Sequence, residues 1–409
     1  MGATTTPIGE ADRLDYLDIL RGLAVLAIFA VNIKAMLAPF PYYSNATLWT
    51  GEYDRLVAAL QVFFIEDKWR TIFTALFGAG LALIAERTAM RDSGSLGLLS
   101  RRLFFLFIFG LIHLLAIWMG DILFAYALCG FLAMWFRNAA AKTLIRWAAK
   151  FLFIAIVWNT LFAIGPAAIP EVRAEIEPFL WGTDPEYIRE TTEQMLGGIG
   201  GHFEARITSA SEYIFMYFLA GGHWLEMLAV MIGGMWAYRT GFFTGAASVS
   251  TYRRALIFGF VAAVICDTIR WTLLNHYNWD FAAYSYLQIL NQLDGYFGAI
   301  GYSGLVGLLV KSGWRPRAVA ATGRMAFTNY IACSLVGTTL AYGHGFSLFN
   351  ALTNLQLLLI TFATWIVILI WSPLWLAHYR FGPLEWLWRS LTYGALQPMR
   401  RVSAPQRAT

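Results

Sequence analysis

His113 and Asp121 are the residues of this sequence whose types and positions most directly suggest chemistry. His113 lies inside an apolar run, and Asp121 follows Gly120 in a short break before the next apolar run. An imidazole titrates near neutral pH and serves as a general base or a nucleophile, and a neighbouring carboxylate orients it. Their separation in sequence leaves contact between them open. Each also has a structural use, His113 as a donor to a neighbouring helix and Asp121 as a helix cap.

Further ionisable residues lie within apolar runs, where each costs about 3 kcal/mol and is by default a functional-site hypothesis. His223 and Glu226 share one helix face by their spacing, and Asp267 and Arg270 repeat that spacing and are expected to neutralise each other. We expect most of these residues to line, with His113, a polar cavity open to the extracytoplasmic side. A structural ion-pair network is the alternative.

Lys68 and Arg70 begin an apolar run at the end where other runs lack cations. This exception suggests an anionic partner, and the neighbouring Glu66 and Asp67 offer local neutralisation instead. We therefore predict Lys68, Arg70, His223 and Glu226 as substrate-binding residues and leave their structural use open.

The elements that must position these residues are transmembrane helices. The chain has 409 residues, of which 58% are hydrophobic and 13% charged, whereas soluble proteins average about 25% charged residues. A spanning helix needs about 20 apolar residues. Ten segments come near this length: 16–38, 69–85, 103–119, 122–136, 151–169, 213–238, 255–274, 284–310, 319–342 and 355–377. We predict an all-α polytopic membrane protein with about ten helices in one integral domain, residues 1–409.

Lys and Arg cluster in alternate connections between these segments, which is the positive-inside pattern. The net charge of +5 therefore indicates topology rather than nucleic-acid binding. We place these connections, both termini and the tail 395–409 in the cytoplasm. The other side then carries a tight hairpin at Gly120 and Asp121 and one larger loop, 170–212.

Small residues recur within the predicted spans, at 77–80, 232–235 and 296–307, and allow helix backbones to approach closely. The three cysteines, Cys129, Cys266 and Cys333, have no paired spacing and suggest neither disulfides nor a zinc site. Six scattered histidines give no haem pattern. We expect neither metal nor haem.

Five motifs carry a resemblance to a known family. They are LDILRGLAVLAIFAVN at 17–32, KWRTIFTALFGAG at 68–80, the RRL, GLIH and GDILFAYAL stretch at 101–128, GRMAFTNY at 323–330 and GPLEWLWRSLTYG at 382–394. In order and position they resemble the YeiB-like bacterial inner-membrane proteins, a family of unknown function. Cys333 departs from the glutamine usual in that family. The opening D-x-x-R-G-x-A followed by VN is similar to that of heparan-glucosaminide acetyltransferases.

This resemblance implies a transmembrane acyltransferase in the bacterial inner membrane. It would move an acyl group from cytoplasmic acyl-CoA to a hydroxyl or amine of a small-molecule or glycan acceptor, reached from the extracytoplasmic side. His113 would be base or nucleophile, oriented by Asp121. Candidates for binding the CoA phosphates are Arg101, Arg102, Arg324 and Arg389, and a conduit between the two sides would be lined by Arg21, Asn32 and Asn329.

Two other classes of function remain open. A transporter or channel for a small anionic or lipid-like solute would use the same cavity and would depend on Lys68, Arg70 or Arg270. A non-catalytic scaffold does not need buried charges. Whether the chain is an enzyme, and whether it forms homo-oligomers in the lipid bilayer, the sequence leaves open.

Overall fold

A computed structural model describes residues 15–89, 95–182, 184–197, 207, 210–211 and 213–401. The predicted loop 170–212 and tail 395–409 therefore lie partly outside the described residues. Within these residues all regular elements are helical, and the only β pairing is an isolated bridge between Tyr379 and Arg400.

The helices fall into long membrane-length elements and short connecting ones. The long helices are α1 (Asp15–Leu37), α4 (Lys68–Ala89), α5 (Ser95–Ile112), α7 (Ala141–Ala168), α11 (His223–Arg239), α12 (Val249–His276), α14 (Gln288–Lys311), α16 (Ala326–Ala341) and α17 (Asn354–His378). The short ones are α2 (Pro41–Ser44), η2 (Ala46–Leu48), α3 (Asp54–Phe64), η3 (His113–Ile117), α6 (Leu123–Ala133), η4 (Met134–Phe136), α8 (Pro170–Trp181), α9 (Pro185–Leu196), η5 (Tyr213–Ala220), α13 (Phe281–Tyr286), α15 (Arg317–Arg324) and α18 (Pro383–Tyr393).

The predicted all-α, multi-pass membrane architecture is confirmed. Seven helical stretches in the described part of the chain are long and apolar enough to cross a membrane: Asp15–Leu37, Asp54–Thr88, Leu96–Ile117, Ala141–Ala168, Val249–His276, Gln288–Lys311 and Asn354–His378. Leu123–Phe136 is a shorter apolar helix. The total of about ten spanning helices stays a prediction.

Breaks divide three of the predicted spans, which corrects their description as continuous helices. Span 213–238 consists of the π-helical η5 and α11, separated at Gly222, whose φ of 76° favours glycine. Span 319–342 is divided at Met325 into α15 and α16, and span 284–310 begins in the separate α13. Apolar residues continue through these breaks, so hydrophobicity alone does not reveal them.

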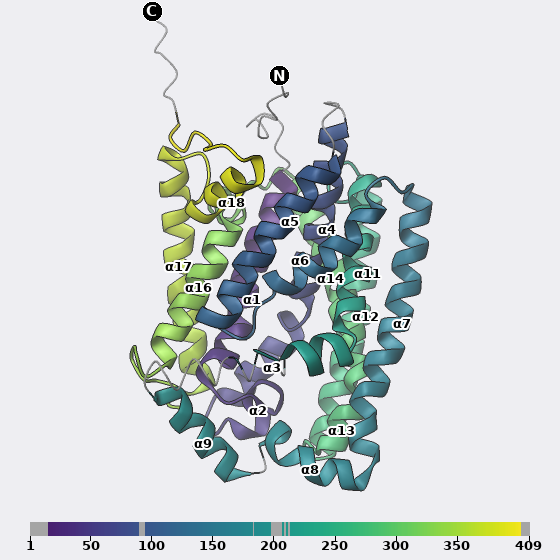
Figure 1. Ribbon diagram of the computed structural model, residues 1–409. Helices are drawn as coiled ribbons and strands as arrows, with labels where there is room; N and C mark the ends of the chain where they lie inside the picture. Colours follow the sequence, from purple (N-terminus) through teal and green to yellow (C-terminus); the bar gives the residue numbers. More distant parts are fainter. Residues whose placement is uncertain are drawn as a thin grey trace, which may run out of the picture.

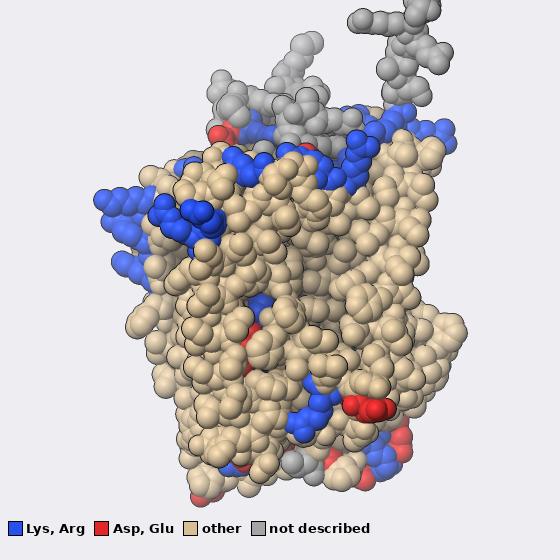
Figure 2. All heavy atoms as spheres, turned by 180° about the vertical axis from the view of Figure 1, so that it is seen from behind, with Lys and Arg blue, Asp and Glu red and all other residues tan. Residues whose placement is uncertain are grey.

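The long helices run side by side in one bundle (Figure 1), and the two ends of the bundle differ. The N-terminal end of α1 and helix α18 lie at one end, whereas α2, α8, α9 and α13 lie at the other. Lys and Arg gather at the end that carries α18, above a mostly uncharged belt (Figure 2). We call the first the basic end and the second the opposite end.

Glycines bring α4 and α11 into backbone contact. A Cβ added to Gly78 would lie 1.9 Å from the Met231 carbonyl oxygen, and one added to Gly234 would lie 1.9 Å from that of Ala75. Two of the small-residue runs thus meet each other, as close packing between membrane helices requires.

A buried lysine joins three helices. Lys68 Nζ lies 2.6 Å from Asp294 Oδ2 on α14 and 3.2 Å from Asp267 Oδ2 on α12, and it donates to the Val62 carbonyl at 2.7 Å. All three charged side chains are at most 2% exposed. The bundle core therefore contains one cation facing two carboxylates, which we call the Lys68 cluster.

This pairing corrects the expectation that Asp267 and Arg270 neutralise each other. Asp267 faces Lys68, and Arg270 Nη1 lies 3.9 Å from Glu66 Oε2. The i,i+3 spacing places both residues on one helix face, but side chains of other helices supply their partners.

We predict that Gly78→Ala destabilises the protein by about 1–3 kcal/mol, because the new methyl group collides with the backbone of α11. Gly80→Ala is the matched control, since a Cβ at Gly80 has no atom within 4 Å. Thermal unfolding of the purified protein in detergent measures both. Equal melting temperatures would contradict the close α4–α11 packing.

Lys68→Met should destabilise the protein by about 3–5 kcal/mol, because it leaves two buried carboxylates without their cation. Adding Asp294→Asn should recover part of the lost melting temperature by removing one of those charges. Lys142→Met, at an exposed position of α7, is the control. If Lys68→Met and Lys142→Met melt alike, the cluster does not stabilise the fold.

Candidate active site

The hairpin between α5 and α6 brings His113 and Asp121 into direct contact. His113 Nδ1 lies 2.8 Å from Asp121 Oδ1, and the two side chains are 1% and 0% exposed. We call this pair the His113–Asp121 dyad. The sequence could not show whether His113 and Asp121 contact each other, and the structure shows that they do.

Local backbone structure fixes both members of the dyad. His113 opens the π-helical turn η3, and the Trp118 N–H donates to its carbonyl at 2.8 Å. Such turns insert one residue into a helix and frequently occur at functional sites. On the other side of the hairpin, the Phe124 N–H donates to Asp121 Oδ2 at 2.5 Å. Asp121 therefore caps the start of α6, as expected, and contacts the imidazole with its other oxygen.

The hydrogen bonding of the dyad determines what the imidazole can do. A carboxylate accepts, so the proton of a neutral imidazole resides on Nδ1, and Nε2 carries a lone pair. His113 Nε2 is buried and has no hydrogen-bond partner among the described residues. A basic nitrogen with no protein partner is the arrangement that a general base or nucleophile requires.

Aromatic side chains surround this imidazole and lead to a pocket. The ring centroids of Tyr330 and Trp118 lie 5.2 Å and 6.5 Å from that of His113. The Tyr330 hydroxyl accepts a hydrogen bond from the Ile122 N–H at 3.4 Å. Tyr330 also lines, with Asn32, a pocket of ≈ 200 Å³ between α1 and α16, its open mouth included. The predicted Asn32 thus lies in the neighbourhood of the dyad.

Asn329 instead connects three helices. Its Nδ2 donates to the Thr322 carbonyl at 3.2 Å and to Ser372 Oγ at 3.1 Å, and its Oδ1 accepts from Trp371 Nε1 at 2.9 Å. The side chain is 0% exposed. These bonds hold α15, α16 and α17 together, so the structure places Asn329 in packing contacts rather than on a pocket wall.

The other predicted binding residues lie in ion pairs or near them. Arg70 contacts Asp67 at 2.9 Å and Glu226 at 3.1 Å, while Lys68 belongs to the Lys68 cluster. The expected local neutralisation by an adjacent carboxylate therefore applies to Arg70. His223 is the half-buried first residue of α11. These ion pairs of Lys68, Arg70 and Glu226 are to residues other than His113 and Asp121.

At the basic end, arginines pack against aromatic rings of the C-terminal segment. The Arg102 guanidinium lies 3.6 Å from the Trp388 ring centroid, and that of Arg389 lies 4.5 Å from the Phe381 ring. Arg389 and Arg21 are within electrostatic reach of Arg102. Arg21 also pairs with Asp18 at 2.9 Å, the contact that their spacing suggested.

The remaining candidate arginines border the same region. Arg101 lies against Gly394, and Arg324 ends α15 one residue before Met325, which lies beside Gly382. The structure thus gathers Arg101, Arg102 and Arg389 around α18 and places Arg324 at its border.

Glu385 joins two of the sequence motifs at this end. Its carboxylate accepts from the Phe327 N–H at 2.7 Å, the Thr328 N–H at 3.0 Å and Thr328 Oγ1 at 2.5 Å. It thereby caps α16 after the break at Met325. Burial raises the pKa of Glu385, and the hydrogen bonds from Thr328 and Phe327 oppose that rise.

Sequence reasoning missed Tyr330, Trp118 and Lys34. Tyr330 ends the GRMAFTNY motif, which gave a signal but no role. Trp118 follows His113 within the hairpin. Lys34 lies near the C-terminal end of the predicted span 16–38, on the side where cations are as unusual as at Lys68. This exception to the charge pattern could have identified Lys34.

Comparison with known proteins identifies the family of this chain. Residues 237–395 match the family described as protein of unknown function (DUF418). The chain is 32% identical to the uncharacterized protein YeiB of Escherichia coli over 409 residues, covering 95% of this chain and 98% of that protein. It is 28% identical to the uncharacterized protein YxaH of Bacillus subtilis over 417 residues, covering 95% and 96%. The chain therefore belongs to the YeiB-like, DUF418-containing family of proteins of unknown function.

Proposed function

We propose that this protein is a transmembrane acyltransferase that moves an acyl group from acyl-CoA to a hydroxyl or amine of an acceptor. The observation that carries the proposal is the His113–Asp121 dyad, whose buried Nε2 has no protein partner in the described residues. The opening motif shared with heparan-glucosaminide acetyltransferases supports the same class of reaction.

The proposed reaction uses His113 as a general base. Nε2 takes the proton of the acceptor hydroxyl or amine, and the acceptor atom attacks the thioester carbonyl. The C–S bond breaks, and the CoA thiolate leaves and receives the proton from the imidazolium. Asp121 holds the ring and stabilises the imidazolium between the two proton transfers. Direct attack by Nε2, with an acyl-imidazole intermediate, is the alternative course.

The donor side of the proposal rests on the basic end. By the positive-inside rule this end faces the cytoplasm of a bacterial inner membrane, so both termini are cytoplasmic there. A guanidinium stacked on an aromatic ring keeps its N–H donors at the edge, where they fit phosphate oxygens. Arg102 and Arg389 are held in this way, which supports a role in binding the CoA phosphates.

Transport of an anionic solute is the second candidate, and its support is weaker. It would depend on Lys68, Arg70 or Arg270, and two of these cations, Lys68 and Arg70, lie within 2.6 Å and 3.1 Å of carboxylates of the protein. Displacing those pairs would leave buried charges without partners.

His113→Ala should lower acyl transfer by about 100-fold or more, because a positioned base is removed. The assay incubates labelled acetyl-CoA, and then longer acyl-CoAs, with protein in lipid and scores CoA release and protein-bound label. His378→Ala, at an exposed position on α17, should leave turnover unchanged. Label retained on the wild type would favour the nucleophilic course. Turnover that survives His113→Ala would contradict the mechanism, and no turnover of any acyl-CoA by the wild type would contradict the function.

Arg102→Gln and Arg389→Gln should each raise the KM for acyl-CoA by about tenfold with a smaller change in kcat, because they weaken donor binding in ground and transition states alike. Arg254→Gln, at an exposed position where α12 begins at the basic end, controls for general loss of positive charge. An equal effect of all three substitutions would argue against a specific phosphate site around α18.

A further inference from the structure

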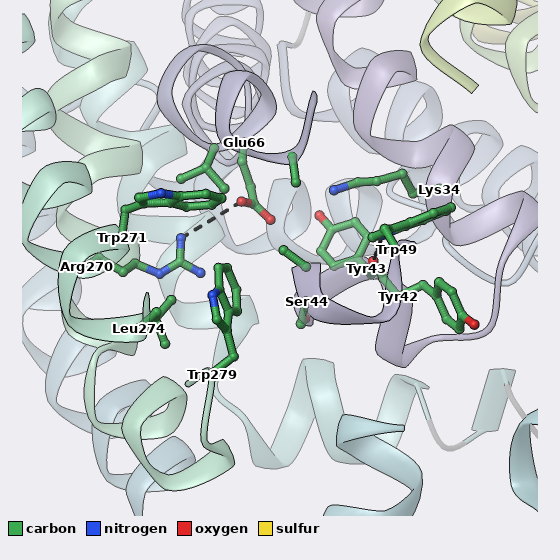
Figure 3. Close-up of a pocket in the computed structure, with 13 residues that line it drawn as sticks. Lys34, Tyr42, Tyr43, Ser44, Trp49, Glu66, Arg270, Trp271, Leu274 and Trp279 are labelled. Atoms are coloured by element: carbon green, nitrogen blue, oxygen red, sulfur yellow. Dashed lines mark hydrogen bonds and ion pairs between the residues drawn. The ribbon is translucent and has the colours of Figure 1, made fainter. Parts of the chain in front are cut away.

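A second pocket lies toward the opposite end of the bundle, where α1, α2 and α12 meet (Figure 3). It holds ≈ 390 Å³ of space between atoms when its open mouth is counted. Three charged side chains, Lys34 from α1, Glu66 from the turn before α4 and Arg270 from α12, converge on it. Lys34 and Arg270 point inward from two sides, with Glu66 between them.

These three charges are buried without close partners. Lys34, Glu66 and Arg270 are 4%, 7% and 5% exposed. Lys34 makes no hydrogen bond or ion pair within the described residues, and its Nζ lies 5.3 Å from the Tyr43 ring centroid. The pair between Arg270 and Glu66 spans 3.9 Å, and Arg270 Nε has no hydrogen-bond partner in the same part of the chain.

Comparison with the cations Lys68 and Arg70 shows how unusual this is. Lys68 contacts two carboxylates at 2.6 Å and 3.2 Å, and Arg70 contacts two at 2.9 Å and 3.1 Å. By contrast, Arg270 lies 3.9 Å from the Glu66 carboxylate, and Lys34 has no ion pair within the described residues. When all three groups are ionised, the pocket has two positive charges and one negative charge, and an anion would complete it.

Aromatic residues form the walls around these charges. Trp271 and Trp279 lie on the side of Arg270, and Trp49 and Tyr43 lie on the side of Lys34. Apolar walls lower the local dielectric and strengthen the attraction between the cations and an anionic group. The enclosed inner part is small, so it fits a head group rather than a whole metabolite.

We propose that this pocket binds the carboxylate or phosphate group of a small anionic ligand, with Lys34 and Arg270 as its cationic contacts. The Arg270 fork offers paired N–H donors to two oxygens of the anion, and Lys34 supplies a point charge opposite it. Glu66 lies beside the anion, where it orients Arg270 and accepts a hydrogen bond from a ligand hydroxyl. The same head-group chemistry occurs in free metabolites and in anionic lipids. The proposal does not depend on acyl transfer.

The test titrates glycerate, glycerol 3-phosphate and glycerol into the full-length protein in detergent by calorimetry. The anionic probes should bind and the neutral one should not. Lys34→Gln and Arg270→Gln should each weaken anion binding by about tenfold or more. Lys311→Gln, an exposed lysine at the other end of the bundle, should change it by less than about twofold.

Glu66→Gln is the control that distinguishes a specific loss of anion binding from a folding defect. It removes the negative charge beside the anion and should tighten binding by about threefold to tenfold, which a misfolded variant would not do. In parallel, melting temperatures in nanodiscs of phosphatidic acid and of phosphatidylcholine report lipid head-group binding. Binding of a soluble probe supports a free ligand, and stabilisation confined to phosphatidic acid and lost in Lys34→Gln supports a lipid.

The proposal is overturned if no soluble anion binds and the two lipids give equal melting temperatures. It is also overturned if anion binding is unaffected by both Lys34→Gln and Arg270→Gln. These measurements contain no acyl-CoA, so their failure is distinguishable from failure of the proposed transferase activity.

Discussion

Neutralisation of the charged corner between α3 and α4 is the constraint on which the arrangement of the bundle depends. Residues 66–70 contain four charged side chains, and a membrane-embedded bundle offers little water to solvate them. Asp67 and Arg70 pair with each other, and the further partners come from other helices: Glu226 on α11, Asp267 and Arg270 on α12, and Asp294 on α14. The pairs of Lys68 and Arg70 with these helices form at 2.6–3.2 Å, so they fix how α11, α12 and α14 sit against α4. The glycines between α4 and α11 follow from the same requirement, because side chains this short allow the helices to come close enough.

The sequence predicts those features that depend on one segment at a time. A backbone in a membrane has to form its hydrogen bonds within its own helix, so apolar runs indicated the all-α bundle, and Gly120 with Asp121 marked the hairpin. Pairing between segments was beyond such reasoning, since the spacing of Asp267 and Arg270 describes one helix face and not the neighbours that face it. The break at Met325 was hidden for the same reason. Glu385, which caps the new helix, lies 58 positions from Phe327 along the chain. At the candidate site, His113 and Asp121 could be identified by type and position, whereas their contact and the packing of Tyr330 depend on tertiary structure.

The cations of this protein have three kinds of surroundings. These surroundings distinguish a structural role from a binding role. In the core, Lys68 is surrounded by carboxylates and has no capacity left for a ligand. At the basic end, the guanidinium groups of Arg102 and Arg389 lie against aromatic rings. In the pocket toward the opposite end, Lys34 and Arg270 lie buried with one carboxylate between them. A purely structural use explains the first arrangement, but it does not explain why the third retains an excess of positive charge.

His113 Nε2 raises a similar question: why a buried polar atom is left without a protein partner. Leaving a buried polar atom without a partner destabilises a protein by about 1–3 kcal/mol. A histidine that only joined two helices would be expected to use both ring nitrogens, and Asp121 could cap α6 without touching the imidazole. In the described structure, the carboxylate instead bonds both the Phe124 amide and Nδ1, and the π-helical turn fixes the ring from the other side. These contacts orient Nε2 while leaving it without a protein partner. The energetic penalty is understandable if Nε2 exchanges a proton with a bound molecule, because a partner from the protein would block that exchange.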